Sequence, residues 1–421
     1  MRNIVKKNEM VEGIIWNYGS LVILSVSGFL FNCIIIYFYD AAALGVFNRT
    51  YAWYCVLSQI TVWGVHMSVM KLTSEYKKDC AERGKILLSA LIGILFFSVI
   101  CVIGIEIILS FVVRNNRNLL VSMQLAMPGL IFFSLNKILL NYLNGLSEMK
   151  AYAIFQSLRY IIIVVTIFII GKMKYASVWL SFCFIEAEII VFLAAIYYLT
   201  HKKLFEKRFT LKYIKQHIRF GTRILPANMV VELNTKVDII CLGVVLGDDF
   251  LIGIYSFAIL FVEGFYQLYV TVRRSINPKI TDYYVNNNLR DGIEKINMNL
   301  KKYFKLFSPI ALLLITIGYC IVCNILNQRE YIAGVKYLII ICVAIAVNGR
   351  KIVFGNIFSQ TGFPMYESAV NVITVIVNFF FNLILIYFMG LSGAAIATAI
   401  SHVIYGFTIH HFAAKKLNII I

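Results

Sequence analysis

The sequence has little charge for its length. Only 14% of its 421 residues are Asp, Glu, Lys or Arg, whereas 60% are hydrophobic, and the mean hydropathy is +0.81. Soluble domains carry about 25% charged residues, so this chain cannot cover a large surface that faces water. The composition excludes a soluble enzyme, a secreted disulfide scaffold and a disordered protein.

The sequence also lacks the motifs of the common enzyme and ATPase classes. It has no GxxxxGK[ST], HExxH, GxSxG or DxD pattern. Its polar segments are too short for a nucleotide-binding domain or for the catalytic loop of a membrane glycosyltransferase. We therefore expect a protein that is not an enzyme and has no cofactor. Its energy would come from an ion gradient, with H⁺ or Na⁺ as the coupling ion, or from a membrane potential or substrate gradient.

Cysteine is present but does not predict disulfides. There are nine Cys residues, an odd number, and most fall within apolar runs. Cys320 and Cys323 form a CxxC inside such a run. There packing is a better interpretation than redox chemistry.

Long apolar runs fill the chain and predict membrane spans, since a helix of about 20 apolar residues crosses a bilayer. Runs of this length exclude a β-barrel, whose strands alternate over about ten residues. We expect an all-α polytopic membrane protein with about twelve transmembrane helices. The predicted spans are 13–38, 44–70, 86–112, 119–142, 152–170, 176–199, 221–246, 251–272, 303–325, 334–358, 364–388 and 390–413.

The distribution of positive charge predicts the orientation of these spans. The net charge is +18, and the basic residues gather in alternate connecting segments. With the N-terminus inside, 27 Lys and Arg lie inside, 7 outside and 5 within spans. The positive-inside rule explains this asymmetry without a nucleic-acid partner. We expect a multi-pass membrane protein with both termini in the cytoplasm.

A basic stretch divides the predicted spans into two sets of six. Residues 201–223, and similarly 279–305, are basic and amphipathic, which is typical of segments that lie along the headgroups. We expect an N-terminal six-helix bundle at 1–200, a linker at 201–220 and a C-terminal six-helix bundle at 221–421. The two bundles would be related by pseudo-twofold symmetry along the membrane normal, with a central cavity between them.

Ionisable residues within spans are costly and mark functional sites. The basic set would form a cationic, substrate-binding cavity suited to a phosphate or diphosphate, or its members would extend to the inner interface. An acidic set would couple transport to H⁺ or Na⁺, or pair with the cations. Glu186 and Glu188 are two apart on one helix, so at most one would face the cavity. No metal site is expected. The basic set is Lys137, Arg159, Lys236, Arg350 and Lys351, and the acidic set is Asp238, Glu232, Glu186 and Glu263.

Four stretches carry a resemblance to a known family: Val62–Lys71 followed by Ser74–Tyr76, Asn144–Lys150, Asn234–Asp238 followed by Gly253–Ser256, and Gly390–Thr398. Their order and spacing along the chain resemble those of the O-antigen (Wzx-type) polysaccharide flippases of the multidrug/oligosaccharidyl-lipid/polysaccharide exporter superfamily.

The resemblance implies a flippase that uses alternating access. Its substrate would be an undecaprenyl-diphosphate-linked oligosaccharide, such as an O-antigen repeat unit for lipopolysaccharide or a related polymer. It would move this substrate from the cytoplasmic to the outer leaflet of a bacterial plasma (inner) membrane. Membrane lipids, a polysaccharide polymerase and chain-length machinery would be further partners. The alternative is a cation-coupled multidrug antiporter of the same superfamily, for which the intramembrane Lys and Arg residues are unfavourable.

Overall fold

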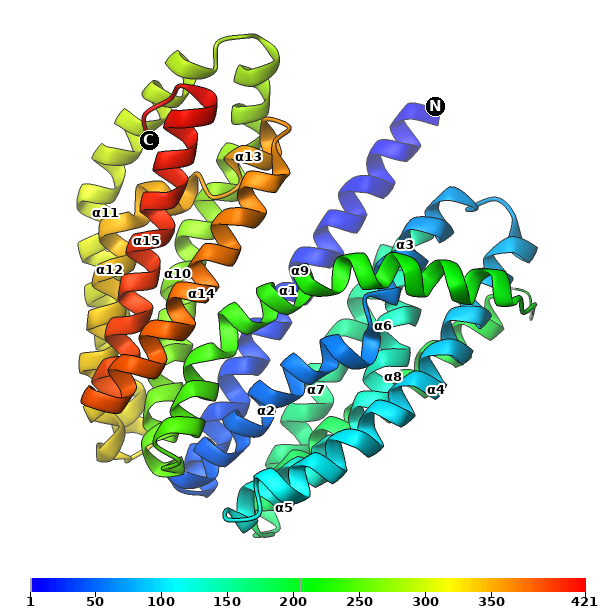
Figure 1. Cartoon of the computed structure of the whole chain (residues 1–421), viewed down its shortest axis with the longest axis horizontal. Coiled ribbons are helices and arrows are strands. Elements are labelled where there is room, and N and C mark those ends of the chain that lie inside the picture. The colour runs from blue at the N-terminus through cyan, green and yellow to red at the C-terminus, as the bar shows by residue number, and fades with distance from the viewer. Residues whose placement is uncertain (1, 205, 207) are drawn as a thin grey trace. The chain divides into compact units, whose positions relative to one another are not determined.

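The computed structural model describes residues 2–204, 206 and 208–421, and side chains from Glu12 onward except Ile14. The described residues form helices joined by short turns (Figure 1). Contacts divide the chain into residues 1–232 and 233–421, called here the first and second units. The helices are α1 Arg2–Phe38, α2 Ala41–Val62, α3 Val65–Glu75, α4 Cys80–Val112, α5 Arg117–Ala126, α6 Gly129–Gly145, α7 Met149–Lys172, η1 Ser177–Ser181, α8 Phe182–His201, α9 Leu211–Val245, α10 Asp249–Val285, α11 Leu289–Ile325, η2 Arg329–Gly334, α12 Val335–Val353, α13 Ile357–Gln360, α14 Pro364–Met389 and α15 Leu391–Leu417.

Short polar residues set several helix starts. The side chains of Asp40, Asp79 and Asn116 each accept a hydrogen bond from the backbone N–H three residues later, at the first turns of α2, α4 and α5. Asp248 does the same for α10. These caps satisfy donors that the helix itself leaves unpaired. The apolar runs therefore begin at defined residues.

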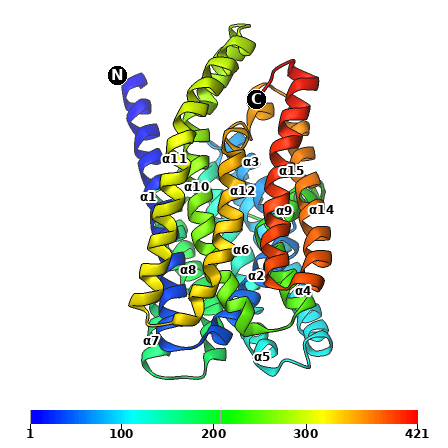
Figure 2. The same ribbon diagram turned by 90° about the vertical axis from the view of Figure 1, so that its left-hand side faces the viewer.

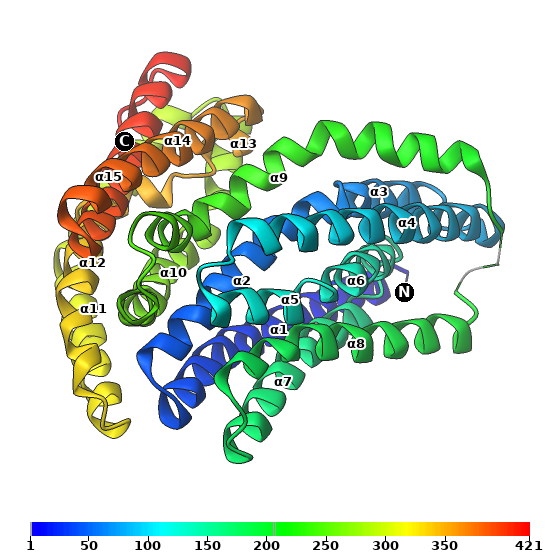
Figure 3. The same ribbon diagram turned by 60° about the horizontal axis from the view of Figure 1, so that its bottom comes forward.

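Helix α6 is the centre of the first unit, where it packs against α2, α3, α4, α7 and α8. Its buried positions include Leu135, Ile138, Leu139 and Tyr142. Helix α1 packs along α7. Figure 3 shows the helices of this unit gathered around α6. The arrangement places the polar positions of α6 among side chains of α2, α7 and α8.

A break between α2 and α3 lets α9 approach the first unit closely. Trp63 and Gly64 both have left-handed backbone conformations, with φ of 49° and 67°. A Cβ atom on Gly221 of α9 would overlap the carbonyl oxygen of Trp63. The Trp63 indole N–H donates to Thr222 Oγ1 at 2.9 Å. Glycine at 221 is required by this close approach of two backbones.

Further along, the beginning of α9 is held by polar contacts. His217 lies 2.9 Å from Ser68 Oγ and 3.1 Å from the carbonyl oxygen of Ile86. Tyr213 donates to Glu82 at 2.7 Å. Half of the predicted linker 201–220 is therefore ordered helix that packs on α3 and α4.

The second unit has its own bundle. Helix α12 packs against α10, α11 and α15, and α14 packs along α15. Figure 2 shows these helices running side by side. Tyr269 of α10 is fully buried and donates to Ser308 of α11 at 2.8 Å. Each unit thus has a core of its own.

Ten described segments are long and apolar enough to cross a membrane. They correspond to the predicted spans other than 44–70 and 221–246. The region of the predicted second span is helical but breaks at Trp63. The predicted seventh span, 221–246, lies in α9, which has Glu232, Lys236 and Asp238 within its apolar run. The all-helical membrane fold is confirmed. Residues 279–285 and 289–305 continue α10 and α11 instead of forming separate surface helices.

Candidate functional site

A polar cavity lies inside the first unit. It has a volume of about 230 Å³ and is walled by α2, α6, α7, α8 and Glu232 of α9. Most spans around it present apolar side chains outward, as a lipid-facing bundle requires. Polar and ionisable groups collected inside such a bundle are a functional site by default. The lining residues are Tyr51, Tyr54, Cys55, Ser58, Gln59, Phe133, Lys137, Leu140, Asn141, Tyr152, Gln156, Arg159, Tyr160, Ile163, Phe184, Glu188 and Glu232.

Helical periodicity explains why these residues meet. On each of three helices the lining positions recur at three- and four-residue steps, which places them on one face. This spacing is visible in the sequence, but the sequence does not show which helix faces pack together around the cavity. The three sets are 51, 54, 55, 58 and 59 on α2, 133, 137, 140 and 141 on α6, and 152, 156, 159, 160 and 163 on α7.

An ion pair joins α7 to α8 at the wall of the cavity. Arg159 Nε lies 2.6 Å from Glu188 Oε1, and Arg159 Nη2 donates to Glu188 Oε2 at 3.0 Å. Asn136 of α6 donates to the same Oε2 at 2.7 Å and to the Glu188 carbonyl at 2.8 Å. The two charged side chains are 14% and 3% exposed. The ion pair and the hydrogen bonds that Arg159 and Asn136 donate to Glu188 therefore tie three helices together.

Lys137 and Arg159 approach the same aromatic ring. The Lys137 ammonium lies 5.4 Å from the Phe133 ring centroid, and the Arg159 guanidinium lies 5.0 Å from it. Such cation–π contacts stabilise cations where water is scarce. The ring of Phe133 thus holds both cations of the cavity near each other.

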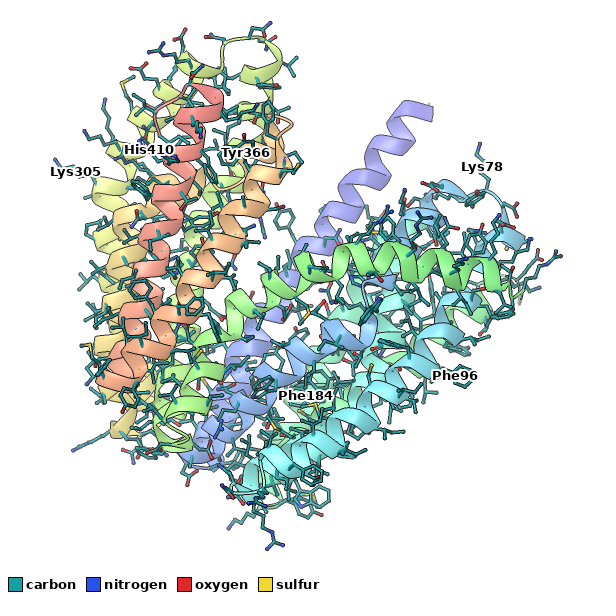
Figure 4. All side chains as sticks on the ribbon, viewed as in Figure 1. Lys78, Phe96, Phe184, Lys305, Tyr366 and His410 are labelled. Carbon is teal, nitrogen blue, oxygen red and sulfur yellow. The ribbon has the colours of Figure 1, made fainter. Side chains whose placement is uncertain are left out.

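Aromatic rings form another part of the wall. Phe184 of α8 stacks on Tyr51 with centroids 5.7 Å apart and on Tyr54 at 5.0 Å. Figure 4 shows Phe184 in the interior of the first unit. These rings contribute a rigid apolar surface with phenolic hydroxyls at its edge.

The cavity contains as many carboxylates as cations. Lys137 and Arg159 are accompanied by Glu188 and Glu232. Glu188 pairs with Arg159 and is the member of the 186/188 pair that lines this cavity. Glu186, the other member of the pair, accepts a hydrogen bond from Thr166 at 2.8 Å and lines a separate crevice with Trp179. The cavity is thus a charge-balanced polar site and not a uniformly cationic one.

The remaining members of the predicted sets lie in the second unit. Arg350 of α12 donates to Asn297 of α11 at 3.0 Å. Lys351 packs near Gly406 of α15, Lys236 is half-buried on α9 and Glu263 is exposed on α10. Of the five predicted basic residues, Lys137 and Arg159 line the cavity in the first unit.

Asp238 is the centre of a second polar cluster. Its carboxylate accepts hydrogen bonds from Asn378 at 3.2 Å and Asn382 at 2.9 Å, both on α14. Thr398 of α15 donates at 2.6 Å, and Tyr255 of α10 donates at 3.2 Å. The Asn382 side-chain oxygen is buried and finds no hydrogen-bond partner among the described residues. A carboxylate surrounded by amide and hydroxyl groups can hold a proton or a hard cation such as Na⁺.

Solved structures with this fold are membrane transporters. The lipid II flippase MurJ in an inward closed conformation is similar with a TM-score of 0.75 and 18% identity, over 96% of this chain and 88% of that chain. An inward-facing multidrug resistance MATE family transporter is similar with a TM-score of 0.68 and 13% identity, over 94% of each chain. A MOP superfamily transporter from Pyrococcus furiosus is similar with a TM-score of 0.63 and 13% identity, over 98% of this chain and 96% of that chain.

The family of the chain follows from a sequence comparison. None of the curated proteins matches the chain. A family model described as polysaccharide biosynthesis protein matches residues 10–284, about two thirds of the chain. The three similar solved structures are those of a flippase and two transporters and not of enzymes. This chain therefore belongs to the polysaccharide biosynthesis protein family and has the fold of the MOP-superfamily transporters.

Proposed function

We propose that this protein is a flippase for an undecaprenyl-diphosphate-linked oligosaccharide, an O-antigen or related repeat unit. It moves this lipid from the cytoplasmic to the outer leaflet of a bacterial plasma membrane by alternating access. The observation that carries the proposal is the cavity of the first unit. There Lys137 and Arg159 lie among amide and phenolic side chains inside an apolar bundle. Family membership and the flippase fold support the same conclusion.

The chemistry of the cavity matches the polar end of such a lipid. Lys137 offers an ammonium group to a phosphate. The guanidinium of Arg159 can bind a phosphate either together with Glu188 or in place of it. Gln59, Asn141 and Gln156 offer amide groups for sugar hydroxyls. A volume of about 230 Å³ is below the usual range for a whole drug-sized ligand, about 300–1,000 Å³. We infer that the cavity holds the diphosphate and the first sugar, with the rest outside it.

We propose that Asp238 couples transport to an ion gradient. Its carboxylate is surrounded by donors from α10, α14 and α15. Binding of H⁺ or Na⁺ would reorganise these hydrogen bonds and change how α14 and α15 pack against α9. Rotation of the Asn382 amide would present its unpartnered oxygen to a cation.

We also propose an orientation of the protein in the membrane and a destination for its product. Both termini are cytoplasmic, and the flipped repeat units pass to a polysaccharide polymerase and chain-length machinery outside. Reporter fusions at each terminus test the orientation. An outward C-terminus would contradict it.

A cation-coupled multidrug antiporter is the second candidate. Glu188 and Glu232 in the cavity are the observation in its favour, because carboxylates attract organic cations. Glu188 is already neutralised by Arg159 at 2.6 Å, however. The flippase is therefore favoured.

Deletion of the gene separates the two candidates. The flippase proposal predicts loss of the surface polysaccharide and accumulation of lipid-linked oligosaccharide in the inner leaflet, restored by the wild-type gene but not by Lys137→Met. Unchanged glycan with new sensitivity to cationic drugs would establish the antiporter instead.

A further inference from the structure

A long apolar groove follows α11 in the second unit. Its volume is about 710 Å³, and its walls come from α10 and α11. Lining positions on α11 recur every four residues, as Lys302, Leu306, Ile310, Leu314 and Gly318. Residues spaced by four form a continuous row on a helix surface. The groove is therefore a track along the helix and not an isolated pit.

The two ends of the groove differ. At the Gly318 end there is open space, because a Cβ atom at Gly318 would meet no heavy atom of the described residues within 4 Å. At the other end Tyr303 stacks on Phe307 with centroids 4.8 Å apart beside Lys302. The groove thus runs from a charged end with an aromatic pair to an apolar end without side-chain obstruction.

The charged end is strongly basic. Lys301, Lys302 and Lys305 are exposed within little more than one helical turn, and Figure 4 shows Lys305 projecting away from α11. From residue 295 to residue 325 the sequence has four Lys and no Asp or Glu. These three lysines form no ion pair with other described residues. The end is therefore complementary to a phosphate group.

The length of the groove selects among lipids. Sixteen residues separate Lys302 from Gly318, which is about 24 Å at a helical rise of 1.5 Å per residue. The hydrocarbon core is about 30 Å thick, so one leaflet supplies only about 15 Å. An ordinary acyl chain whose phosphate lies at Lys302 would end before the groove does. The occupant needs a longer hydrocarbon chain.

We propose that this groove binds a polyprenyl phosphate lipid, with its phosphate at Lys302 and its isoprenoid chain along α11 toward Gly318. The choice of a polyprenyl carrier over other long-chain lipids rests on the proposed function. The site itself rests on the row of lining residues, the basic end and the open space at Gly318. It gives the protein a means of recognising the lipid part of its substrate that is separate from the cavity in the first unit.

The test uses the purified full-length protein and native mass spectrometry with three probes: undecaprenyl phosphate, farnesyl phosphate and phosphatidylglycerol. We expect undecaprenyl phosphate to bind at least tenfold more tightly than either of the others. Gly318→Leu should weaken it at least fivefold and leave farnesyl phosphate unchanged. Lys302→Ala should weaken both prenyl phosphates. Equal binding of the three probes, or full binding by Gly318→Leu, would overturn the proposal.

Two further variants keep the test decisive. Gly104→Leu is the matched control, since a Cβ at this α4 glycine also meets no described atom within 4 Å. It should bind as the wild type does. If Gly318→Leu does not fold, Leu314→Trp blocks the same track from a position that is 64% exposed. A dimer that these variants dissociate would indicate a second copy in the groove and overturn the proposal.

Failure here and failure of the proposed function can be told apart. Weak undecaprenyl phosphate binding with normal glycan export by the same protein would remove the groove site and leave the flippase standing. If undecaprenyl phosphate binds tightly in a Gly318-dependent way, but deletion of the gene leaves the surface glycan unchanged, the groove site stands and the flippase function falls.

Discussion

Arg159 and Glu188 form a buried ion pair between α7 and α8, with Arg159 Nε 2.6 Å from Glu188 Oε1 and one hydrogen bond from Nη2 to Oε2. Asn136 of α6 donates to the same carboxylate. The pair lines the cavity of the first unit, so it is both a structural tie and the group that an entering phosphate would meet. Under the proposed function, Arg159 would exchange Glu188 for a phosphate of the substrate as its partner.

Removing one member of this pair should destabilise the protein. Glu188→Gln leaves the Arg159 guanidinium buried without its counter-charge, which costs about 3 kcal/mol in comparable sites. We expect a clear fall in the Tm of the purified protein. The double variant Arg159→Gln/Glu188→Gln should lose less stability than the sum of the two single variants. Additive losses would mean that the two charges do not interact.

Lys137 should be required for transport but not for folding. Lys137→Met keeps an unbranched apolar side chain of similar length while removing the ammonium and its cation–π contact with Phe133. One charge-assisted hydrogen bond contributes about 1.5–3 kcal/mol, so export should fall about ten- to hundredfold at normal protein level. The exposed Lys172 at the end of α7 supplies the control, and Lys172→Met should export normally. Quantification of the surface glycan gives the result, and normal export by Lys137→Met would remove this residue from the site.

Asp238 should confer the dependence on an ion. Asp238→Asn keeps the size of the side chain but cannot hold a proton or balance a cation in the cluster of Asn378, Asn382 and Thr398. We expect the wild-type export rate to vary with external pH or Na⁺ and the variant to lose that dependence. A variant that responds to both conditions as the wild type does would make Asp238 a structural residue.

The contact of α9 with the break between α2 and α3 should not tolerate a larger residue at Gly221. Gly221→Ala places a methyl group onto the carbonyl oxygen of Trp63. We expect a loss of about 1–3 kcal/mol, since the backbones must separate. Gly104→Ala has open space and should be neutral. Thermal unfolding of both variants measures the difference, and equal Tm values would show that the approach of the two backbones is looser.

His217 should make the docking of α9 sensitive to acid. Burial lowers the pKa of His217 from 6.5 to about 4, and its ring contacts Ser68 and the Ile86 carbonyl. Between these two pH values the unfolded state binds the proton and the folded state does not. Stability therefore falls as the pH falls from about 6.5 to about 4, by up to about 3 kcal/mol. The Tm of His217→Gln should vary less over this range, and an identical pH profile would contradict the account.

The sequence predicts most of the helices because apolar runs determine them. The run 86–112 corresponds to α4 and 364–388 to α14, with ends within a few residues. The break at Trp63 was not predictable from hydrophobicity, because it depends on left-handed backbone and on the packing of Gly221. The extension of α11 back to Leu289 was missed because its first turns are polar, although they continue the same helix.

The site was predictable only in part. Intramembrane charge identified Lys137 and Arg159, but it could not assign a facing direction to Glu186 or Glu188. The grouping of Tyr51, Tyr54 and Gln59 with the charged residues needed the packing of four helices, although their spacing on α2 was visible.

The most direct test of the central claim is translocation by the purified protein in vesicles. The vesicles would contain undecaprenyl-diphosphate-linked oligosaccharide, and a membrane-impermeant lectin or glycosidase would report its appearance on the opposite leaflet. We expect protein-dependent translocation that Lys137→Met lowers about ten- to hundredfold and Lys172→Met preserves. Translocation at the wild-type rate by Lys137→Met, or none by the wild type under imposed pH and Na⁺ gradients, would contradict it.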